Sequence, residues 1–133
     1  MTPIRLKANG TCAASLEVEL SDAGKRHALF DNVDGGSKGK PEFHFGNSDH
    51  VITAPLNATV LASTAAASDN SPAVAIDYGG RWFSTQFHPE SAVPFWHQIV
   101  DAKLIKGNKT DYRDCSATGR QLISNFLTLA ISN

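Results

Sequence analysis

The sequence of 133 residues contains only two cysteines and one methionine, and it has no long apolar run. The isolated Cys12 and Cys115 fit neither a disulfide framework nor a zinc site with closely spaced pairs of ligands. No apolar segment approaches the length of a membrane span, and the first residues lack the apolar core of a secretion signal. We therefore expect a cytoplasmic protein that does not associate with membranes.

Runs of one charge are also missing. The chain has 12 lysines and arginines against 13 aspartates and glutamates, which gives a formal net charge of −1. This balance, without a basic run, argues against nucleic acid as a partner. Hydrophobic residues make up 41% and charged residues 19%, which is an ordinary globular mixture. The length suits a single domain with a hydrophobic core.

Residues 81–90 are the stretch richest in chemical information, and they read Arg-Trp-Phe-Ser-Thr-Gln-Phe-His-Pro-Glu. The aromatic residues predict a buried strand that ends in a polar triplet. Such a strand places His88 at the carboxyl edge of a sheet, where open α/β sheets build their sites. Pro89 keeps His88 out of helical geometry, and this stiff corner can turn Glu90 back towards the imidazole. A carboxylate on one ring nitrogen orients a general base, although a surface histidine beside a turn is the alternative.

Three segments together resemble one known family. Residues 85–90, Thr-Gln-Phe-His-Pro-Glu, resemble the Q-[FW]-H-P-E signature of class I glutamine amidotransferases. Residues 47–63 are similar to the H-x-D-x-V…L-P…A-x-x-L-A-x-S segment of that family, and residues 119–127 to its closing helix with N-F-L. The resemblance extends over most of the chain and is closest to the stand-alone branch that looks like the amidotransferase domain of GMP synthase. It implies an α/β protein, part of a flavodoxin-like amidotransferase fold with a mixed sheet and two C-terminal helices.

The resemblance also implies a reaction, the hydrolysis of the side-chain amide of L-glutamine. In this family a cysteine thiolate attacks the amide carbon, ammonia leaves, and water clears the thioester. By position His88 would be the general base and acid, and Glu90 would orient it. No cofactor is implied, since a triad hydrolyses an amide without one. Asp49 is a candidate for holding the amino group of the substrate, with a structural turn carboxylate as the alternative.

The nucleophile is where the chain departs from the family. The G-x-C-x-G-x-Q elbow that carries the catalytic cysteine is absent. Cys12 has Ala14 and Leu16 where glycine and glutamine would stand, while Cys115 follows the His-Pro-Glu triplet and has its glycine and glutamine at wrong offsets. We expect both cysteines to be ordinary small apolar residues.

The missing elbow predicts that residues 1–133 form a single partial amidotransferase domain without the N-terminal half. A half-sheet leaves exposed edges and an unburied face, so we expect a separate N-terminal half, a synthase partner or a homodimer. Two functions stay open: an enzyme part whose thiolate comes from outside, and an inactive, truncated or degenerate domain that acts as an interaction or regulatory module. The reading frame upstream of Met1 would discriminate between them.

A metal site is a weaker alternative. The side chains of suitable type are His44, Asp49, His50, His88 and Glu90. No two of them have the close spacing of a zinc-binding pair.

Periodicity predicts the elements. Strands are expected, with antiparallel or mixed pairing, at 15–20, 42–46, 59–63, 73–78 and 81–87. A turn is expected at 21–24, a short helical turn anchored by Leu29 and Phe30, and loops at 1–14, 34–41 and 69–72. A helix is expected near 91–103, with an inner face made of Val93, Trp96, Ile99, Val100 and Leu104. A last helix is expected after the N-cap Ser116, and its apolar stripe consists of Leu122, Ile123, Phe126, Leu127 and Leu129.

Overall fold

The computed structural model describes residues 5–33, 40–64 and 72–132, and the loops expected at 34–41 and 69–72 lie mostly outside them. The elements follow in this order: β1 (Arg5–Leu20), α1 (Asp22–Arg26), η1 (Ala28–Phe30), β2 (Glu42–Thr53), β3 (Thr59–Thr64), β4 (Ala73–Asp77), β5 (Phe83–Thr85), α2 (Val93–Asp101), η2 (Lys109–Asp111) and α3 (Ser116–Ile131).

The five strands form one sheet in the order β2-β1-β3-β4-β5. Every described pairing is antiparallel. The mixed sheet that the resemblance implied is therefore not found among the described strands, and the antiparallel alternative of the local pattern is the one observed. A further pairing of Val51 with Ala73 joins β2 to β4 and folds the sheet back on itself.

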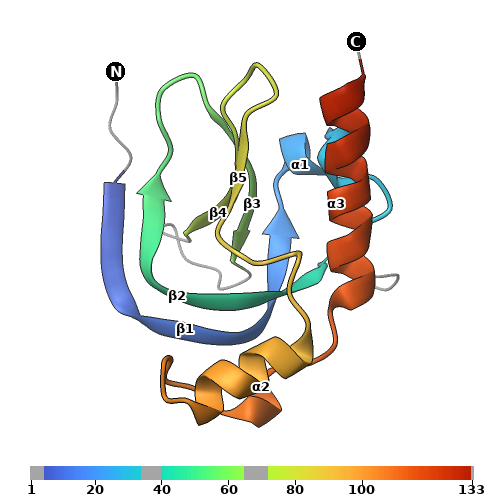
Figure 1. Cartoon of the computed structure of the whole chain (residues 1–133). Helices are drawn as coiled ribbons and strands as arrows, with labels where there is room; N and C mark the ends of the chain where they lie inside the picture. Colours follow the sequence, from blue (N-terminus) through green and yellow to red (C-terminus); the bar gives the residue numbers. More distant parts are fainter. Residues whose placement is uncertain (1–4, 34–39, 65–71, 133) are drawn as a thin grey trace.

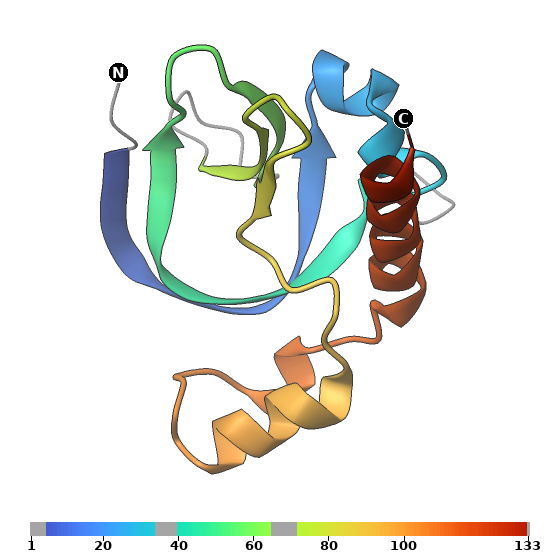
Figure 2. The ribbon, with the colours of Figure 1, turned by 45° about the horizontal axis from the view of Figure 1, so that its top comes forward.

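The helices occupy two different places around this sheet. Figure 1 shows β1 and β2 as a long curved ribbon, with α2 below its bend and α3 beside the sheet. The turned view in Figure 2 shows the same arrangement, with the chain after β5 running down to α2 and returning upward into α3. The α/β class and the late helices agree with the prediction from sequence.

The first two strands are longer than their local sequence suggests. Residues 5–14 were expected in a loop, but β1 begins at Arg5, and β2 continues through residues 47–50 to Thr53. The two strands pair from Arg5 opposite Thr53 to Glu17 opposite Glu42, with register shifts at residues 5–6 and 8–12. Residues 5–14 form a strand because β2, a distant segment, supplies their backbone hydrogen bonds, so the prediction of a loop there was wrong.

The connection after β1 is a short helix instead of the expected turn. Ser21 caps α1, because its hydroxyl oxygen accepts the N–H of Gly24 at 3.0 Å and its proton goes to the carbonyl of Val60 at 2.6 Å. A side chain at Gly24 would clash with the backbone of Leu61, so this glycine lets α1 sit directly on β3. The short helical turn η1 follows as predicted.

The core lies between the sheet and the helices, and aromatic rings connect it to the end of β5. Phe43 and Phe87 are fully buried and stacked, with ring centroids 4.0 Å apart and an interplanar angle of 13°. The predicted strand 81–87 is regular only over β5, and Trp82 is 75% exposed instead of buried. Trp82 belongs to the hairpin turn, where its N–H donates to the carbonyl of Gly79 at 3.1 Å.

The helices correct three further expectations. In α2 Trp96 is buried as expected, but Leu104 lies beyond the helix and is 77% exposed. Helix α3 starts at Ser116, so its N-cap is Cys115 and not the predicted Ser116. Part of the expected apolar stripe is turned to the outside, because Phe126 and Leu127 are exposed. No helix in the described ranges is both long and apolar enough to cross a membrane.

Candidate active site

The chain between β5 and α2 forms a corner that carries His88 at the rim of the sheet. Backbone hydrogen bonds fix its approach: the N–H of Gln86 donates to the carbonyl of Val74 at 2.8 Å, and that of His88 to the carbonyl of His44 at 2.9 Å. The hydroxyl of Thr85 donates to the carbonyl of Phe87 at 3.0 Å. His88 is therefore held directly by β2, which is distant in the sequence, while β4, the hairpin partner of β5, holds the residues before it.

The predicted contact between the histidine and the following carboxylate is present. Nδ1 of His88 lies 2.9 Å from Oε1 of Glu90. An ionised carboxylate only accepts hydrogen bonds, so Nδ1 carries the proton and Nε2 has a free lone pair in the neutral ring. Nε2 makes no hydrogen bond to the described residues, and 43% of the side chain is exposed. This is the arrangement of an oriented general base, while the exposure of both groups means that the pair adds little stability.

Buried aromatic side chains form the floor beneath His88. Its ring meets Trp96 edge-on, with centroids 5.4 Å apart, and Trp96 stacks on Tyr112 at 4.9 Å. A side chain at Gly46 would clash with the Trp96 ring, so this glycine lets α2 pack against the bend of β2. The hydroxyl of Tyr112 donates to the carbonyl of Phe45 at 2.8 Å. Sequence analysis assigned this floor no role in the site, because it joins three segments that are distant in sequence.

Asp49, the predicted substrate-binding residue, is not brought to this corner. It is exposed on β2 and pairs with Ala8, so it is a strand residue and not a turn carboxylate. Five residues of strand separate it from His44, which corresponds to roughly 16 Å at about 3.3 Å per residue. No described contact joins Asp49 to His88 or Glu90. The structure thus brings two of the three predicted site residues together.

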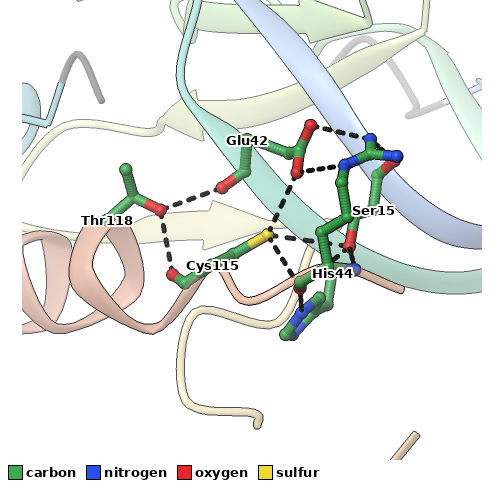
Figure 3. A network of polar contacts seen from close by, with 6 residues as sticks. Ser15, Glu42, His44, Cys115 and Thr118 are labelled. Atoms are coloured by element: carbon green, nitrogen blue, oxygen red, sulfur yellow. Dashed lines mark hydrogen bonds and ion pairs between the residues drawn. The ribbon is translucent and has the colours of Figure 1, made fainter. Parts of the chain in front are cut away.

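Cys115 lies in a separate polar network at the start of α3 (Figure 3). Its sulfur is directed towards Ser15 and Glu42, with Sγ 3.6 Å from the Ser15 hydroxyl and 3.7 Å from the Glu42 carboxylate. Burial raises the pKa of the Cys115 thiol to about 11, and the nearby carboxylate adds to the effect. A thiol with this pKa is protonated at neutral pH and is not a nucleophile.

An ion pair closes this network at the surface. Arg113 donates from Nε to Oε1 of Glu42 at 2.8 Å and from Nη2 to Oε2 at 2.7 Å. The hydrogen bonds from Arg113 lower the pKa of the Glu42 carboxyl, and the same bonds raise the pKa of Arg113. The pair ties β2 to the segment before α3, and no described contact joins it to His88.

Cys12 is the other cysteine. It lies inside β1 opposite Asn47, and not at the turn between a strand and a helix where a nucleophile elbow would be. The described residues contain no cluster of three potential histidine, cysteine or carboxylate ligands for a metal.

An apolar cavity of about 170 Å³ opens next to the corner, between β5, η1 and α3. Pro89 and Thr85 belong to its wall, together with Leu29, Phe83, Ser84, Leu122, Ile123 and Phe126. β5 is the last strand in the order of the sheet, and among the described residues it pairs with β4 alone. An open strand edge and an apolar cavity therefore adjoin the His88–Glu90 pair.

Comparison with known proteins identifies the fold. No protein-family model matches the sequence, and no significant match is found among curated proteins. Several solved structures are similar over almost the whole chain, and two of them serve as examples. A proposed GMP synthase component from Thermoplasma acidophilum matches 95% of it with a TM-score of 0.59 and 19% identity. A glutamine amidotransferase from Thermotoga maritima matches 98% with a TM-score of 0.58 and 14% identity.

The fold is therefore that of the class I glutamine amidotransferases, as the sequence motifs indicated. The chain covers 48% of the Thermoplasma protein and 54% of the Thermotoga protein, which is about half the length of each.

Proposed function

We propose that this chain supplies the histidine and carboxylate of a glutamine amidotransferase site and that another polypeptide segment supplies the cysteine. The observation that carries the proposal is the 2.9 Å contact of His88 Nδ1 with Glu90, which leaves Nε2 free at an exposed rim. The amidotransferase fold supports glutamine as the substrate. The reaction would take place in the cytoplasm and would need no cofactor.

In the proposed reaction Nε2 of His88 accepts the proton of the incoming cysteine thiol, and the thiolate attacks the carbonyl carbon of the glutamine side chain. The C–N bond breaks as the imidazolium returns the proton to the leaving nitrogen, and ammonia departs. His88 then takes a proton from water, whose oxygen attacks the thioester, and glutamate and the thiol are released. Glu90 holds the ring in the tautomer that leaves Nε2 as the base.

The surroundings of the two cysteines of the chain support an external origin for the nucleophile. Cys115 is a buried thiol in a network of its own, and Cys12 lies within a strand. The structural neighbours are about twice as long as this chain, so their folds contain a further segment with no counterpart here. We infer that residues 1–133 are a partial domain and that such a segment carries the nucleophile elbow.

The face between β5 and α3 suits the docking of that segment. It combines the free edge of β5, the apolar cavity, and the exposed side chains of Phe126 and Leu127. Exposed apolar surface next to an unpaired strand edge is typical of an interface. We propose that the segment with the elbow covers this face and places its cysteine near Nε2 of His88.

The first experiment is ammonia release from L-glutamine, measured for the 133-residue chain and for its His88→Ala variant. We expect no release from either. The second uses the polypeptide encoded with the upstream reading frame, or that segment added separately. Here we expect release, and we expect His88→Ala to lower kcat by about 10²–10⁴-fold, the usual contribution of a general base.

Each result has a distinct meaning. Release by the isolated chain that is lost in His88→Ala would show that the nucleophile lies in this chain. An upstream segment without an elbow, or no release in its presence, would overturn the enzymatic proposal and favour a degenerate interaction module. Light scattering of Phe126→Glu beside the wild type tests the docking face: a wild-type dimer that the substitution dissociates would show that a second copy occupies it.

A further inference from the structure

We propose that Ser91 is a positioning residue that fixes the backbone of His88 and thereby the direction of its imidazole. Ser91 follows directly after the His-Pro-Glu triplet, and its side chain points back under it. The inference rests on the proposed function, because it concerns the base of that reaction. It adds a residue that does not touch the substrate and acts through His88.

The backbone of His88 is anchored at both of its polar groups. Its N–H donates to the carbonyl of His44 at 2.9 Å. Its carbonyl accepts the hydroxyl of Ser91 at 2.9 Å and, at the longer distance of 3.3 Å, the N–H of Ser91. Pro89 lacks an N–H and contributes no donor to the corner. Of the two hydrogen bonds that this carbonyl accepts from Ser91, the one from the hydroxyl is the shorter.

The hydroxyl is itself held from below by the buried floor. The indole N–H of Trp96 donates to Oγ of Ser91 at 2.8 Å, and Nδ1 of His44 lies 3.0 Å from the same oxygen. Nε2 of His44 faces the carbonyl of Arg113 at 2.7 Å and therefore carries a proton. In a neutral ring Nδ1 is then an acceptor, which shares the single hydroxyl proton of Ser91 with the carbonyl of His88. Ser91 joins α2 and β2 to the catalytic corner through one oxygen atom.

The same tryptophan touches the ring of His88 from the side. Trp96 is 2% exposed and stacks on Tyr112, so it can neither move away nor find water for its N–H. Its hydrogen bond to Ser91 supports the backbone turn at His88, and its edge contact with the imidazole supports the plane of that ring. A misplacement of about 1 Å costs an enzyme up to about 10²-fold in rate, so such support has a measurable effect.

NMR spectroscopy of the 15N-labelled chain tests the proposal without any activity. The variants are Ser91→Ala, which removes the hydroxyl, Ser91→Thr, which keeps it, and Ser91→Cys, which keeps the volume but bonds weakly. Ser124→Ala, at an exposed position of α3, is the matched control. The readouts are the ring tautomer of His88, its NOEs to Trp96, and the exchange rate of the indole proton.

In the wild type we expect the Nδ1–H tautomer of His88 and NOEs between the two rings. Ser91→Ala should weaken both and speed exchange of the indole proton by about tenfold, as expected for one lost hydrogen bond. Ser91→Thr should restore them, and core amides such as that of Ile76 should stay protected. If Ser91→Ala does not fold, Ser91→Cys should show the same changes more weakly.

A folded Ser91→Ala or Ser91→Cys variant with an unchanged tautomer and unchanged NOEs would overturn the positioning role. So would a loss of protection that spreads evenly over the core, since that indicates general destabilisation. In the complete amidotransferase Ser91→Ala should lower kcat by about 10-fold or more and leave KM nearly unchanged. Absence of activity in the wild type would refute the proposed function, whereas the NMR result would still decide the role of Ser91.

Discussion

Gly119 of α3 lies directly against the backbone of Pro89, so that a Cβ at Gly119 would clash with the carbonyl oxygen of Pro89. Helix α3 and the corner at His88–Glu90 are thus in contact without a side chain between them. Because Pro89 separates His88 from Glu90, the position of α3 bears on the geometry of the pair. The relationship joins two segments that resemble amidotransferase motifs and are 30 residues apart in the sequence.

We expect Gly119→Ala to destabilise the protein, although alanine favours a helix interior by about 1 kcal/mol over glycine. The added methyl group must displace the backbone of Pro89, and overpacking of this kind costs about 1–3 kcal/mol. Urea unfolding measures the difference. Ser124→Ala, on the exposed side of the same helix, is the control and should be neutral or slightly stabilising. A more stable Gly119→Ala protein would contradict the prediction, because it would show that the backbone at Pro89 shifts at little energetic cost.

The Glu42–Arg113 pair predicts a loss of stability in acid. The pKa of the Glu42 carboxyl is lowered from 4.5 by the hydrogen bonds from Arg113, so the folded state binds its proton less readily than the unfolded chain. The stabilisation is present above pH 4.5 and is lost as the pH falls through the lowered folded value. Glu42→Gln should therefore reduce the unfolding free energy at pH 7 by about 0.5–1 kcal/mol, a modest figure because Arg113 is exposed.

Denaturant titrations between pH 7 and pH 2 test this expectation. The wild type and Glu42→Gln should converge as the acid protonates Glu42. Arg113→Lys keeps the charge but not the two parallel hydrogen bonds, so it should lie between the two. Curves that run in parallel down to pH 2 would contradict a role of this ion pair in acid stability.

Cys115 predicts a loss of stability in alkali. Its folded pKa is about 11 against an ordinary value of 9.0, because burial disfavours the thiolate. The stability that this shift contributes is complete below pH 9 and is lost as the pH rises towards 11, where the thiolate forms. Cys115→Ala should remove this part of the alkaline loss. Unfolding monitored between pH 8 and pH 11 provides the comparison, and identical slopes would refute the assignment.

The same burial predicts low reactivity at neutral pH. In a Cys12→Ser background, iodoacetamide should modify Cys115 at least about tenfold more slowly in the folded chain than in urea, since the thiolate is the reactive form. Mass spectrometry follows the reaction. Rapid modification of the folded protein at pH 7 would reveal an accessible thiolate and reopen Cys115 as a nucleophile.

We expect substitutions of Asn125 to destabilise the contact between α3 and η1. Its side-chain N–H group donates to the carbonyls of Leu29 at 3.0 Å and Asp31 at 2.7 Å, and its oxygen accepts from Gln121 at 3.0 Å. Asn125→Ala should cost about 1–2 kcal/mol through the lost hydrogen bonds. Asn125→Asp should cost more, because a carboxylate cannot donate and would face two carbonyl oxygens. Thermal unfolding that ranks the aspartate variant as the more stable would contradict this geometry.

Local interactions explain which features of the fold were predictable. The short helical turn with Leu29 and Phe30, the strands β3 and β4, and the two late helices follow from periodicity within a few residues. The contact of His88 with Glu90 was predictable for the same reason, because it spans two residues across a proline.

The early strands show where local patterns fail. Residues 5–14 have no clear alternation, yet they form a strand because β2 pairs with them. Trp82 suits a buried strand by its type, but it is exposed because positive φ angles at Gly79, Gly80 and Arg81 place it in the turn. In both segments the backbone partner decided the outcome, and that partner is not visible in the local sequence.

The sequence by itself determined the amidotransferase motifs, the late helices and the pairing of His88 with Glu90, because each depends on neighbours along the chain. Only the tertiary structure decided what surrounds them: Ser91 and Trp96 beneath His88, Gly119 against Pro89, and the raised pKa of Cys115. These features depend on burial and on hydrogen bonds between segments up to 100 residues apart, and only the folded chain brings such segments together.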